Sequence, residues 1–453
     1  MIRGADATSD TIPATLTAMQ AAAIEWQIII VGAGPAGAAA AQRCAERGVR
    51  VLLIDRSAMP RWKVCGCCLS VTAMRELQAL GYRDARASSA PLQATPLGGV
   101  QLAAGGRIAV REFPGGGVMS RETLDATLVR AAIARGCHWL PQASVLAIQE
   151  PSQQASGQRQ TDPLLAVEVL VSAHQDRSGQ EHADPAAAVS PVWLETKRCV
   201  LATGLADAVR LPADETSAGS DRSRAAAGRG DPSSNRIGVG GVLGPHVRGP
   251  EPGRLVMAVA PGGYCGLVRL PDGRVDVAAA IDRRMFRGHG SPAAAVTAVL
   301  DQALGDHAAE LIDREQLAAV DVRATPPLTR ALPLVVGGER RILRIGDAAG
   351  YVEPFTGEGI GWSLASARLL AESLLDATAG LRPARDAAAR YEAAHRKHVG
   401  PLHRRCRRMA LALRRPLLVA AAVRAARYAP WAASRLVPIV IGAAGQGEHD
   451  PWA

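Results

Sequence analysis

Two apolar runs near the start of the chain flank a glycine-rich turn and an alanine-rich segment. The stretch QIIIVGAGPAGAAAAQRCAERGVRVLLIDRS opens with a β-branched run, continues with an amphipathic segment that Gly48 closes, and finishes with an apolar run ending at Asp55. Buried strands are short apolar runs of this kind, and a segment with helical spacing that ends in glycine favours a helix. The pattern therefore predicts a strand–helix–strand unit.

The next periodic segment is VMSRETLDATLVRAAIARGC, in which Leu124, Leu128 and Ile133 recur near helical spacing behind Ser120. A serine before the first apolar position is a good helix N-cap, and acidic residues follow it in the first turn. We predict a helix here, and then short strands around Val145, Val167 and Val192.

Alternating apolar and polar residues from Arg254 to Asp282 surround the turn LPDGRV. Alternation of period two around a Gly-containing turn predicts a hairpin, here part of a mostly antiparallel sheet. The last third returns to a strand, a glycine loop and a helix in RRILRIGDAAGYVEPFTGEGIGWSLASARLLAESLLDA, and helices follow to the end. The glycines of GVGGVLG, from Gly238, follow a polar stretch, and we interpret them as a flexible turn.

Composition bounds the function. The chain has 453 residues, a net charge of +10 and eight cysteines without regular spacing. No signal peptide is evident, so we predict a reducing, cytoplasmic location. The apolar run from Trp26 to Gln42 approaches the length of a membrane span, but its glycines and proline interrupt it, and we predict no transmembrane helix.

Cations cluster near the C-terminus in HRKHVGPLHRRCRRMALALRR. Because no stacking aromatic residues are interleaved with them, a solvated helix face is favoured over nucleic-acid binding. The following segment LRRPLLVAAAVRAARYAPWAASRLVPIVIGAAG alternates cations with apolar residues. It is compatible with packing on the body, which we favour, or with peripheral contact to a membrane surface.

The first motif with a recognisable binding role is a set of three glycines. Gly32, Gly34 and Gly37 form GxGxxG between the predicted strand and helix, and Asp55 ends the next strand. The glycines allow a tight turn, close approach of the backbone to a pyrophosphate and close helix packing, while the acid can hold a ribose hydroxyl. Phosphate would then lie at the positive end of the helix. The motif predicts a dinucleotide site and leaves NAD and FAD open.

A second glycine loop lies in the last third. Asp347 directly follows a predicted strand, and the turn from Gly357 to Gly361 opens a helix. A carboxylate can bind a ribityl or ribose hydroxyl, and free N–H groups at a helix start face negative charge such as that of a reduced flavin ring. This loop favours FAD.

The segment PRWKVCGCCLS has three cysteines in four positions. Cys65 and Cys68 taken alone are compatible with half of a metal site, with a redox dithiol or with a loop that lies against a ligand. A structural zinc site needs four ligands, and neither a second CxxC nor a paired His at the usual spacing is present. A redox dithiol usually opens a helix, so the loop interpretation is favoured.

Taken together, GAGPAG, SRETLDATL, the ATG of CVLATG and GDAAGYVEPFTGEGI resemble the FAD-dependent superfamily that contains group A flavin monooxygenases and geranylgeranyl reductases. PRWKVCG is similar to the PRxKxCG segment of the geranylgeranyl reductase branch. The resemblance covers roughly residues 28–371. It implies an α/β fold: a Rossmann-like FAD-binding domain of the glutathione-reductase type, an inserted, mostly antiparallel substrate sheet, and C-terminal helices.

The resemblance also implies a division of the chain. The FAD-binding domain would comprise residues 26–80, 111–150, 195–210 and 335–380, and the substrate domain residues 81–110 and 236–334. Separately from the resemblance, residues 1–25 have the pattern of a flexible leader, and the polar composition of residues 172–190 and 212–235 predicts flexible insertions. Residues 381–453 would form C-terminal helices.

The implied site residues fall into three groups. The ADP half of FAD would contact the first glycine loop and its acid, and Arg121 would hold ribose or phosphate. Asp347 would contact the ribityl and pyrophosphate region, and the second glycine loop the flavin pyrimidine. Arg61, Lys63 and Cys65 would lie near the isoalloxazine ring as candidate catalytic residues. The full implied cofactor set is Gly32, Gly34, Ala36, Gly37, Asp55, Arg56, Cys65, Gly66, Arg121, Gly204, Gly346, Asp347, Gly357, Gly359 and Ile360.

Two segments depart from the family pattern. Where the family often has Gly-Gly after the cysteine, this chain has Gly66 and Cys67, which places a side chain in a tight loop. Where many hydroxylases carry ADGxxSxVR, which serves both FAD and NADPH, residues 202–210 are ATGLADAVR. The electron donor therefore stays open, with NADPH and NADH as candidates.

The substrate side is predicted to be apolar. Tyr264, Cys265 and Phe355 are compatible with an apolar pocket for a small hydrophobic molecule or with core packing. The first hypothesis is a monooxygenase that hydroxylates an apolar or aromatic metabolite. The second is a reductase that saturates isoprenoid double bonds, favoured by PRWKVCG; the lack of WxWxIP argues against a halogenase. The third is a flavin-binding protein without catalysis. The sequence leaves the oligomeric state open.

Overall fold

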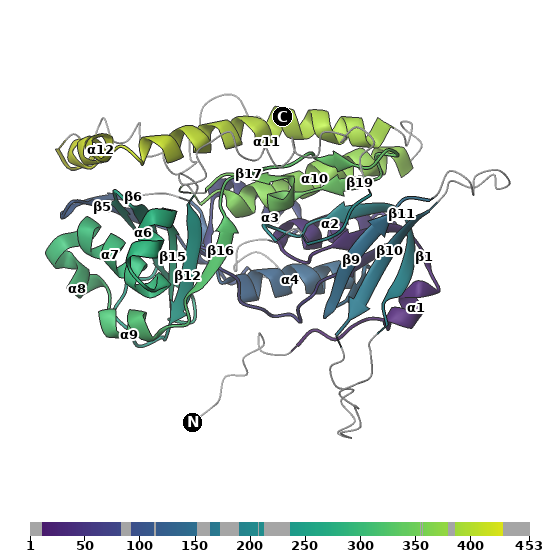
Figure 1. Ribbon diagram of the computed structural model, residues 1–453, viewed down its shortest axis with the longest axis horizontal. Helices are drawn as coiled ribbons and strands as arrows, with labels where there is room; N and C mark the ends of the chain where they lie inside the picture. The colour runs from purple at the N-terminus through teal and green to yellow at the C-terminus, as the bar shows by residue number, and fades with distance from the viewer. Residues whose placement is uncertain are drawn as a thin grey trace, which may run out of the picture.

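Two large β-sheets, two small ones and a layer of helices make up the described part of the chain (Figure 1). The computed structural model describes residues 11–82, 92–112, 115–151, 164–172, 190–206, 208–212, 236–353, 355, 357–378 and 386–428. The two predicted insertions therefore lie almost wholly outside the described residues, as do residues 1–10 and 429–453.

The first sheet is the predicted dinucleotide-binding sheet. The parallel strands β1, β2, β8, β11 and β19 pair in the order β19-β11-β1-β2-β8. β18 extends one edge, and β9 and β10 form an antiparallel extension on β11. Their bounds are β1 Glu25–Val31, β2 Val51–Ile54, β8 His138–Leu140, β9 Ala143–Gln149, β10 Leu165–Val171, β11 Val192–Leu201, β18 Val335–Val336 and β19 Ile342–Arg344.

Helices bury the apolar strand runs of this sheet. The helix of the predicted strand–helix–strand unit, α2 (Pro35–Ala45), packs beside α4 (Arg121–Ala134) and α10 (Gly359–Thr378), and α3 (Val71–Ala79) packs against α10. Most residues of α2 are buried alanines, so neighbouring helices approach closely. Ser120 caps α4 by accepting from the Thr123 N–H, as predicted. This sheet with its helices is called the first lobe.

The second lobe is a seven-stranded sheet in the order β16-β12-β15-β14-β13-β5-β6. Every neighbouring described pair is antiparallel except β13 with β5, and β14 and β15 form the predicted hairpin around LPDGRV. One face is covered by α7, and the cavity described below lies against the other. The strands are β5 Gly99–Ala104, β6 Arg107–Glu112, β12 Ile237–Leu243, β13 Arg254–Ala260, β14 Gly263–Arg269, β15 Val275–Ile281 and β16 Arg323–Pro327; the helices are α6 Arg283–Gly288, α7 Pro292–Leu304, α8 Ala308–Leu311 and α9 Arg314–Ala319.

Short elements join the lobes. The strands β3, β4 and β7 form one small sheet, and β17 pairs with β20. The 3-10 turns η4 and η5 follow α7 and β19. Their bounds are β3 Cys68–Leu69, β4 Thr95–Pro96, β7 Gly117–Val118, β17 Arg330–Ala331, β20 Gly350–Tyr351, η4 Gly305–His307 and η5 Gly346–Ala349.

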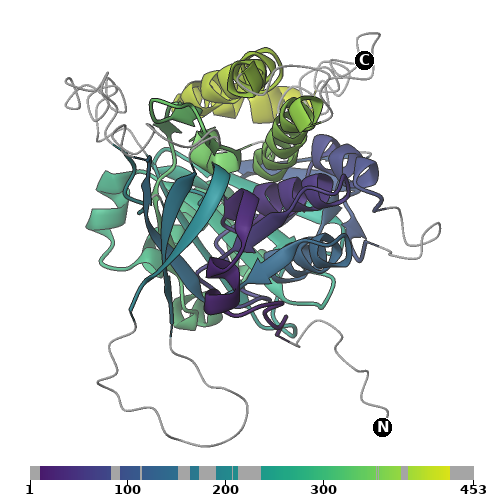
Figure 2. The same cartoon turned by 90° about the vertical axis from the view of Figure 1, so that its right-hand side faces the viewer.

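The C-terminal helices α11 (Ala387–Ala412) and α12 (Pro416–Tyr428) run across both lobes, as Figures 1 and 2 show from two directions. α11 packs on α10, and the apolar face of α12 packs on β5 and β6 through Val419 and Val423. The favoured prediction of packing on the body is thus confirmed for these helices. Leu411 and Leu418 are 60% and 57% exposed on the outer side. No described helix is long and apolar enough to cross a bilayer.

Two sequence predictions need correction. Residues 11–24 of the predicted leader are packed: Ile12 and Leu16 are buried, and α1 (Ala18–Ala22) lies beside β11. The stretch GVGGVLG is the interior strand β12 and not a flexible turn. Its glycines follow from crowding, because a Cβ on Gly238 or Gly241 would approach a neighbouring side chain to 2.6 or 2.7 Å.

Candidate cofactor and substrate site

The first glycine loop ends β1 and opens α2. Gly32 has φ of +102°, a value that favours glycine, and a Cβ on Gly37 would lie 1.8 Å from the Gly32 carbonyl oxygen. Gly34 is the N-cap of α2 and makes no side-chain cap. The N–H groups at the start of α2 therefore face the outside of the helix end, where an anionic phosphate would be stabilised.

Asp55, at the end of β2, holds this loop in place. Its Oδ2 accepts from the Ala33 N–H at 2.7 Å, and its Oδ1 accepts from the Ser57 N–H at 2.9 Å. The Arg61 Nη2 lies 3.5 Å from the same carboxylate. Each oxygen can accept a further donor, so the geometry is compatible with a ribose hydroxyl at this point.

A buried ion cluster stands beside the glycine loop. Arg121, 7% exposed at the start of α4, donates to Asp125 through Nε at 2.9 Å and through Nη2 at 2.7 Å. Arg61 Nη1 lies 3.6 Å from the same carboxylate. Because a Cβ on Gly34 would come within 3.5 Å of Arg121 Nη2, the guanidinium directly flanks the loop. This places positive charge next to the helix end.

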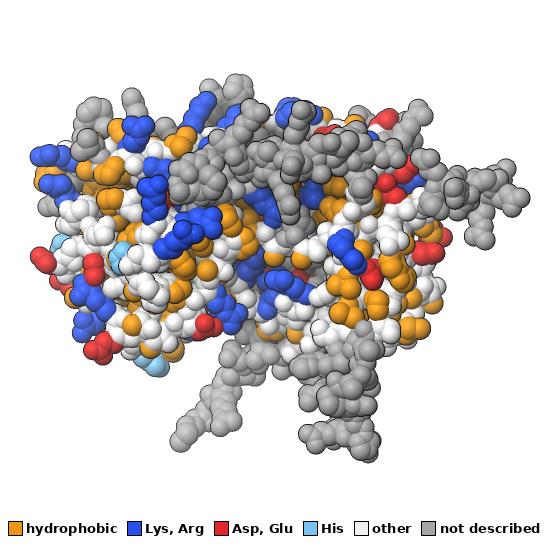
Figure 3. Space-filling view, viewed as in Figure 1, with side chains coloured by type: hydrophobic (Ala, Val, Ile, Leu, Met, Phe, Trp, Pro, Cys, Tyr) orange, Lys and Arg blue, Asp and Glu red, His pale blue; other side chains and the backbone are white. Residues whose placement is uncertain are grey.

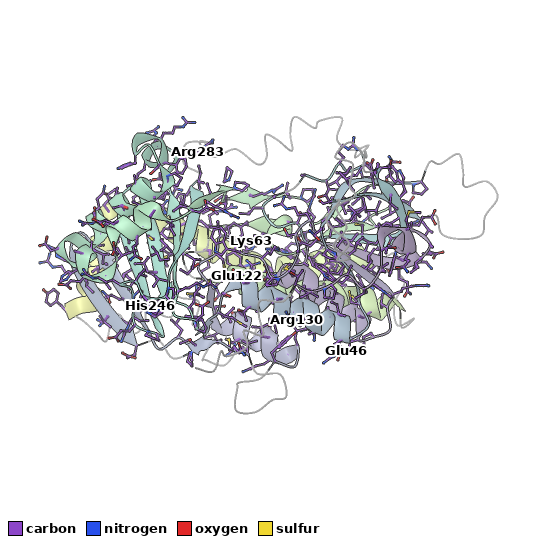
Figure 4. The ribbon with its side chains drawn as sticks, turned by 90° about the horizontal axis from the view of Figure 1, so that it is seen from below. Glu46, Lys63, Glu122, Arg130, His246 and Arg283 are labelled. Atoms are coloured by element: carbon purple, nitrogen blue, oxygen red, sulfur yellow. The ribbon has the colours of Figure 1, made fainter. Side chains whose placement is uncertain are left out.

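Lys63 and Asp347 are two further buried titratable groups on the cavity wall. Burial, with Arg121 and Arg61 nearby, lowers the pKa of Lys63, while Asp347 opposes that shift. Burial raises the pKa of the Asp347 carboxyl, and Lys63 and Arg121 oppose the rise. Lys63 lies between the two lobes (Figure 4), and Lys and Arg side chains appear in the middle of the face in Figure 3.

The second glycine loop closes the site from the C-terminal third. Gly346 and Gly357 have φ of +59° and +68°, and α10 begins at Gly359. Glu358, between Gly357 and Gly359, is 4% exposed and accepts a hydrogen bond from the Ser70 hydroxyl at 2.9 Å. Burial raises the pKa of Glu358 to about 7, and hydrogen bonds from Ser70 and Thr72 limit that rise. The loop is thereby tied to the start of α3.

One cavity of about 430 Å³ joins these elements to the second lobe. It runs from the start of α2 to the sheet face formed by β12–β15. It brings together most of the predicted site residues, while Gly32, Gly37, Asp55 and Arg61 lie behind its wall. The predicted residues that line it are Gly34, Ala36, Arg56, Lys63, Cys65, Gly66, Arg121, Gly204, Tyr264, Gly346, Asp347, Phe355, Gly357, Gly359 and Ile360.

The far end of the cavity is apolar. Tyr264 and Phe355 stand edge to face with ring centroids 5.0 Å apart, and Leu255, Met257 and Leu328 complete this wall. Behind them, Arg236 is fully buried. It donates to Glu353 at 3.1 Å and to Asp282 at 3.2 Å, and it lies 5.4 Å from the Tyr264 ring. This network fixes the aromatic wall.

The cysteines of PRWKVCGCCLS also line the cavity. A hydrogen bond from Cys67 and the nearby Arg121 guanidinium lower the pKa of Cys65 to about 6, although burial opposes this. Burial raises the pKa of Cys68 instead. No three His, Cys, Asp or Glu side chains gather as metal ligands within the described residues.

Several residues here were not predicted from the sequence. Arg236 and Asp276 lie in no sequence motif, and only the fold brings them behind the cavity wall. Glu353 and Glu358 lie inside the GDAAGYVEPFTGEGI segment, but no role was predicted for them there. Thr203 had a signal in the sequence, because it takes the place of the Asp in the ADGxxSxVR pattern of hydroxylases. Its buried Oγ1 has no hydrogen-bond partner among the described residues. That orphaned hydroxyl faces a cavity able to hold a polar ligand atom.

Comparison with known proteins agrees with this geometry. Residues 25–176 match the family described as FAD binding domain. A menaquinone reductase of Mycobacterium tuberculosis (strain H37Rv) is 34% identical over 131 residues, which are 28% of this chain and 31% of that protein. The match thus spans about a third of that relative's length.

Solved structures share the fold across both lobes. A geranylgeranyl bacteriochlorophyll reductase-like protein of Thermoplasma acidophilum has a TM-score of 0.63 and 15% identity, with 89% of this chain and 92% of that chain covered. A protein of Pseudomonas aeruginosa described as a probable FAD-dependent monooxygenase has a TM-score of 0.59 and 17% identity, with 88% and 99% covered. At these identities the likeness concerns the fold.

Proposed function

We propose that this chain, which belongs to the FAD-dependent oxidoreductase superfamily of group A flavin monooxygenases and geranylgeranyl reductases, is an enzyme that reduces a double bond of an apolar substrate. The observation that carries the proposal is that one continuous cavity joins the two glycine loops to an apolar wall. The same cavity is lined by the glycine loops at one end and by apolar side chains at the other.

The residues present fit FAD. The open N–H groups at the start of α2 would bind the pyrophosphate, and Arg121 would add positive charge. Asp347 and the orphaned Thr203 hydroxyl would hold polar atoms along the cofactor's middle, and the start of α10 would face the flavin ring. Bound FAD would supply the electron pair for the reduction.

The chain's own residues would position the substrate and exclude water. The aromatic wall of Tyr264 and Phe355, held by Arg236, suits an isoprenoid or quinone-like molecule because it offers apolar area without charge. Lys63 and Arg121 would hold the anionic end of the cofactor away from that apolar chamber. NADPH or NADH is the proposed source of electrons.

Reduction is favoured over hydroxylation by the PRWKVCG segment on the cavity wall and by the matched relatives, which are named menaquinone reductases. Monooxygenation of an aromatic metabolite is the second candidate. The edge-to-face pair of Tyr264 and Phe355 favours it, since an aromatic substrate can stack on such a wall. The fold shared with the Pseudomonas monooxygenase also supports it.

Product analysis with and without oxygen tests the proposal. The purified, FAD-loaded protein is incubated with NADPH and a menaquinone that carries an unsaturated isoprenoid chain, under argon and in air. A product formed under argon that is still heavier by two hydrogen atoms after the quinone ring has been reoxidised in air supports the reductase. A product heavier by one oxygen atom, formed only in air, supports the monooxygenase and contradicts the reductase. A protein that binds no FAD contradicts both.

A further inference from the structure

The C-terminal helix α11 has two faces of opposite character. Tyr391, Val399 and Cys406 lie buried on the face that packs on the body. Lys397 and Arg404 are exposed on the opposite face, and exposed positions continue from Arg404 at spacings of three and four residues. Such spacing keeps side chains on one side of a helix. These exposed positions, called the outer stripe, reach the start of α12 and comprise Lys397, Arg404, Arg408, Leu411, Arg415 and Leu418.

The cations of the outer stripe have no acids beside them in the sequence. Residues 393–428 contain no Asp or Glu. Within the described residues, no ion pair holds Arg404, Arg408 or Arg415, whereas the neighbouring Arg414 lies 3.4 Å from Asp282. Uncompensated cations on one face produce a positive potential that attracts an anionic surface. The outer stripe is therefore suited to a partner with negative charge.

Two leucines stand among these cations. Leu411 and Leu418 are 60% and 57% exposed, and they lie between or beside arginines of the outer stripe. Figure 3 shows Lys and Arg side chains beside hydrophobic ones at the upper left, where Figure 1 places α12. A helix face that mixes cations with large apolar side chains is typical of helices that lie in the headgroup region of a bilayer. Nucleic acid would gain nothing from leucines, because its backbone is charged and its bases stack on aromatic rings.

The outer stripe lies on the side of the molecule where the cavity is apolar. Val423, on the inner face of α12, belongs to the same apolar cluster as Leu255 and Phe355 of the cavity wall. Arg414, at the junction of α11 and α12, lies 3.9 Å from Glu353 of the network behind that wall. A bilayer in contact with the outer stripe would therefore face the end of the molecule that holds the apolar chamber.

We propose that the outer stripe docks this protein onto an anionic lipid bilayer. Leu411 and Leu418 insert at the boundary between headgroups and acyl chains, and the cations of the stripe lie against lipid phosphates. The docking goes beyond the proposed function and does not depend on it. One consequence does rest on the proposed function: an isoprenoid substrate dissolved in the bilayer would lie on the same side as the apolar end of the cavity.

Flotation of the full-length protein with lipid vesicles tests the docking without turnover. Vesicles of phosphatidylcholine with phosphatidylglycerol are compared with vesicles of phosphatidylcholine alone. Wild type should partition onto the anionic vesicles about tenfold or more strongly than onto the neutral ones, and added salt should weaken that partitioning. Leu411→Ser combined with Leu418→Ser should weaken partitioning onto the anionic vesicles about tenfold, because two apolar side chains no longer leave water.

Matched variants control for charge and for exposed apolar area. Arg408→Gln with Arg415→Gln should weaken partitioning about tenfold, whereas Arg47→Gln with Arg50→Gln, exposed on the first lobe, changes the net charge equally and should have little effect. Met19→Ser removes a side chain that is 72% exposed on α1, which Figure 1 shows at the far end from α12, and should leave partitioning unchanged. Thermal unfolding checks that each variant is folded.

Three results would overturn the docking proposal. The first is wild type that stays off the anionic vesicles, including wild type that binds a duplex oligonucleotide instead, which would identify a nucleic-acid surface. The second is a leucine double variant that partitions as strongly as wild type, since the cations alone would then adsorb. The third is an equal effect of the two arginine pairs. The vesicles contain no quinone, so failure of the docking is distinguished from failure of the proposed reduction.

Discussion

Glu358 offers a test of the buried loop between the two halves of the cofactor site. It lies between Gly357 and Gly359, is 4% exposed, and is held by the Ser70 hydroxyl at 2.9 Å. Glu358→Gln keeps the shape and the hydrogen bond but removes the titration. The variant therefore isolates the free energy that is linked to protonation of this one side chain.

The magnitude follows from the pKa. Burial raises the pKa of Glu358 from 4.5 to about 7. Because the folded state binds the proton more tightly, the stabilisation is fully present below pH 4.5 and is lost as pH rises through about 7. At about 1.4 kcal/mol per pKa unit, the whole shift is worth about 3 kcal/mol of unfolding free energy.

Urea unfolding at several pH values measures this difference. Wild type should lose roughly 2 to 3 kcal/mol relative to Glu358→Gln between about pH 5 and about pH 8. Glu251→Gln, on the exposed turn before β13, is the matched control and should show no such trend. If the free-energy difference between wild type and Glu358→Gln is the same at both pH values, the carboxyl is not buried as a neutral acid and the reasoning is refuted.

Three further substitutions test other parts of the site. Gly37→Ala should abolish FAD retention, because the new Cβ would lie 1.8 Å from the Gly32 carbonyl oxygen. Flavin absorbance after gel filtration measures the retention. The control Gly244→Ala has open space around its new Cβ and should retain flavin. Arg236→Met should lower the unfolding free energy by about 3–5 kcal/mol, because Glu353 loses its hydrogen-bonded partner and keeps only the more distant Arg414, 3.9 Å away. Adding Glu353→Leu should recover part of that loss, and equal stability of the two variants in urea would contradict this. Phe355→Ala should raise KM for an apolar substrate about tenfold with a smaller change in kcat, and an unchanged KM would place the substrate elsewhere.

The sequence predicted the parts of the site that depend on backbone geometry. The glycines of the two loops and the cap at Ser120 could be found because a turn or helix start demands particular residues at particular spacings. The partner of Arg121, Asp125, lies one helical turn away, at a spacing where an ion pair on a helix can be expected. The partner of Glu358 could not be found in this way, because Ser70 is 288 residues away and no local pattern encodes that contact.

The misinterpreted strand shows how the site and the fold depend on each other. The glycines of β12 indicate a turn when only local conformation is considered, yet Gly240 lies under the PRWKVCG loop, where a Cβ would be 2.9 Å from Val64. Gly66 of that loop lies in turn against Ala278, at 3.9 Å from a constructed Cβ. Small residues on the sheet thus let the loop lie flat against it. A Cβ on Gly240 would lie 2.9 Å from Val64 in the loop and 3.0 Å from the Val277 carbonyl oxygen of the neighbouring strand, so this position needs glycine both for the loop and for the pairing of the sheet.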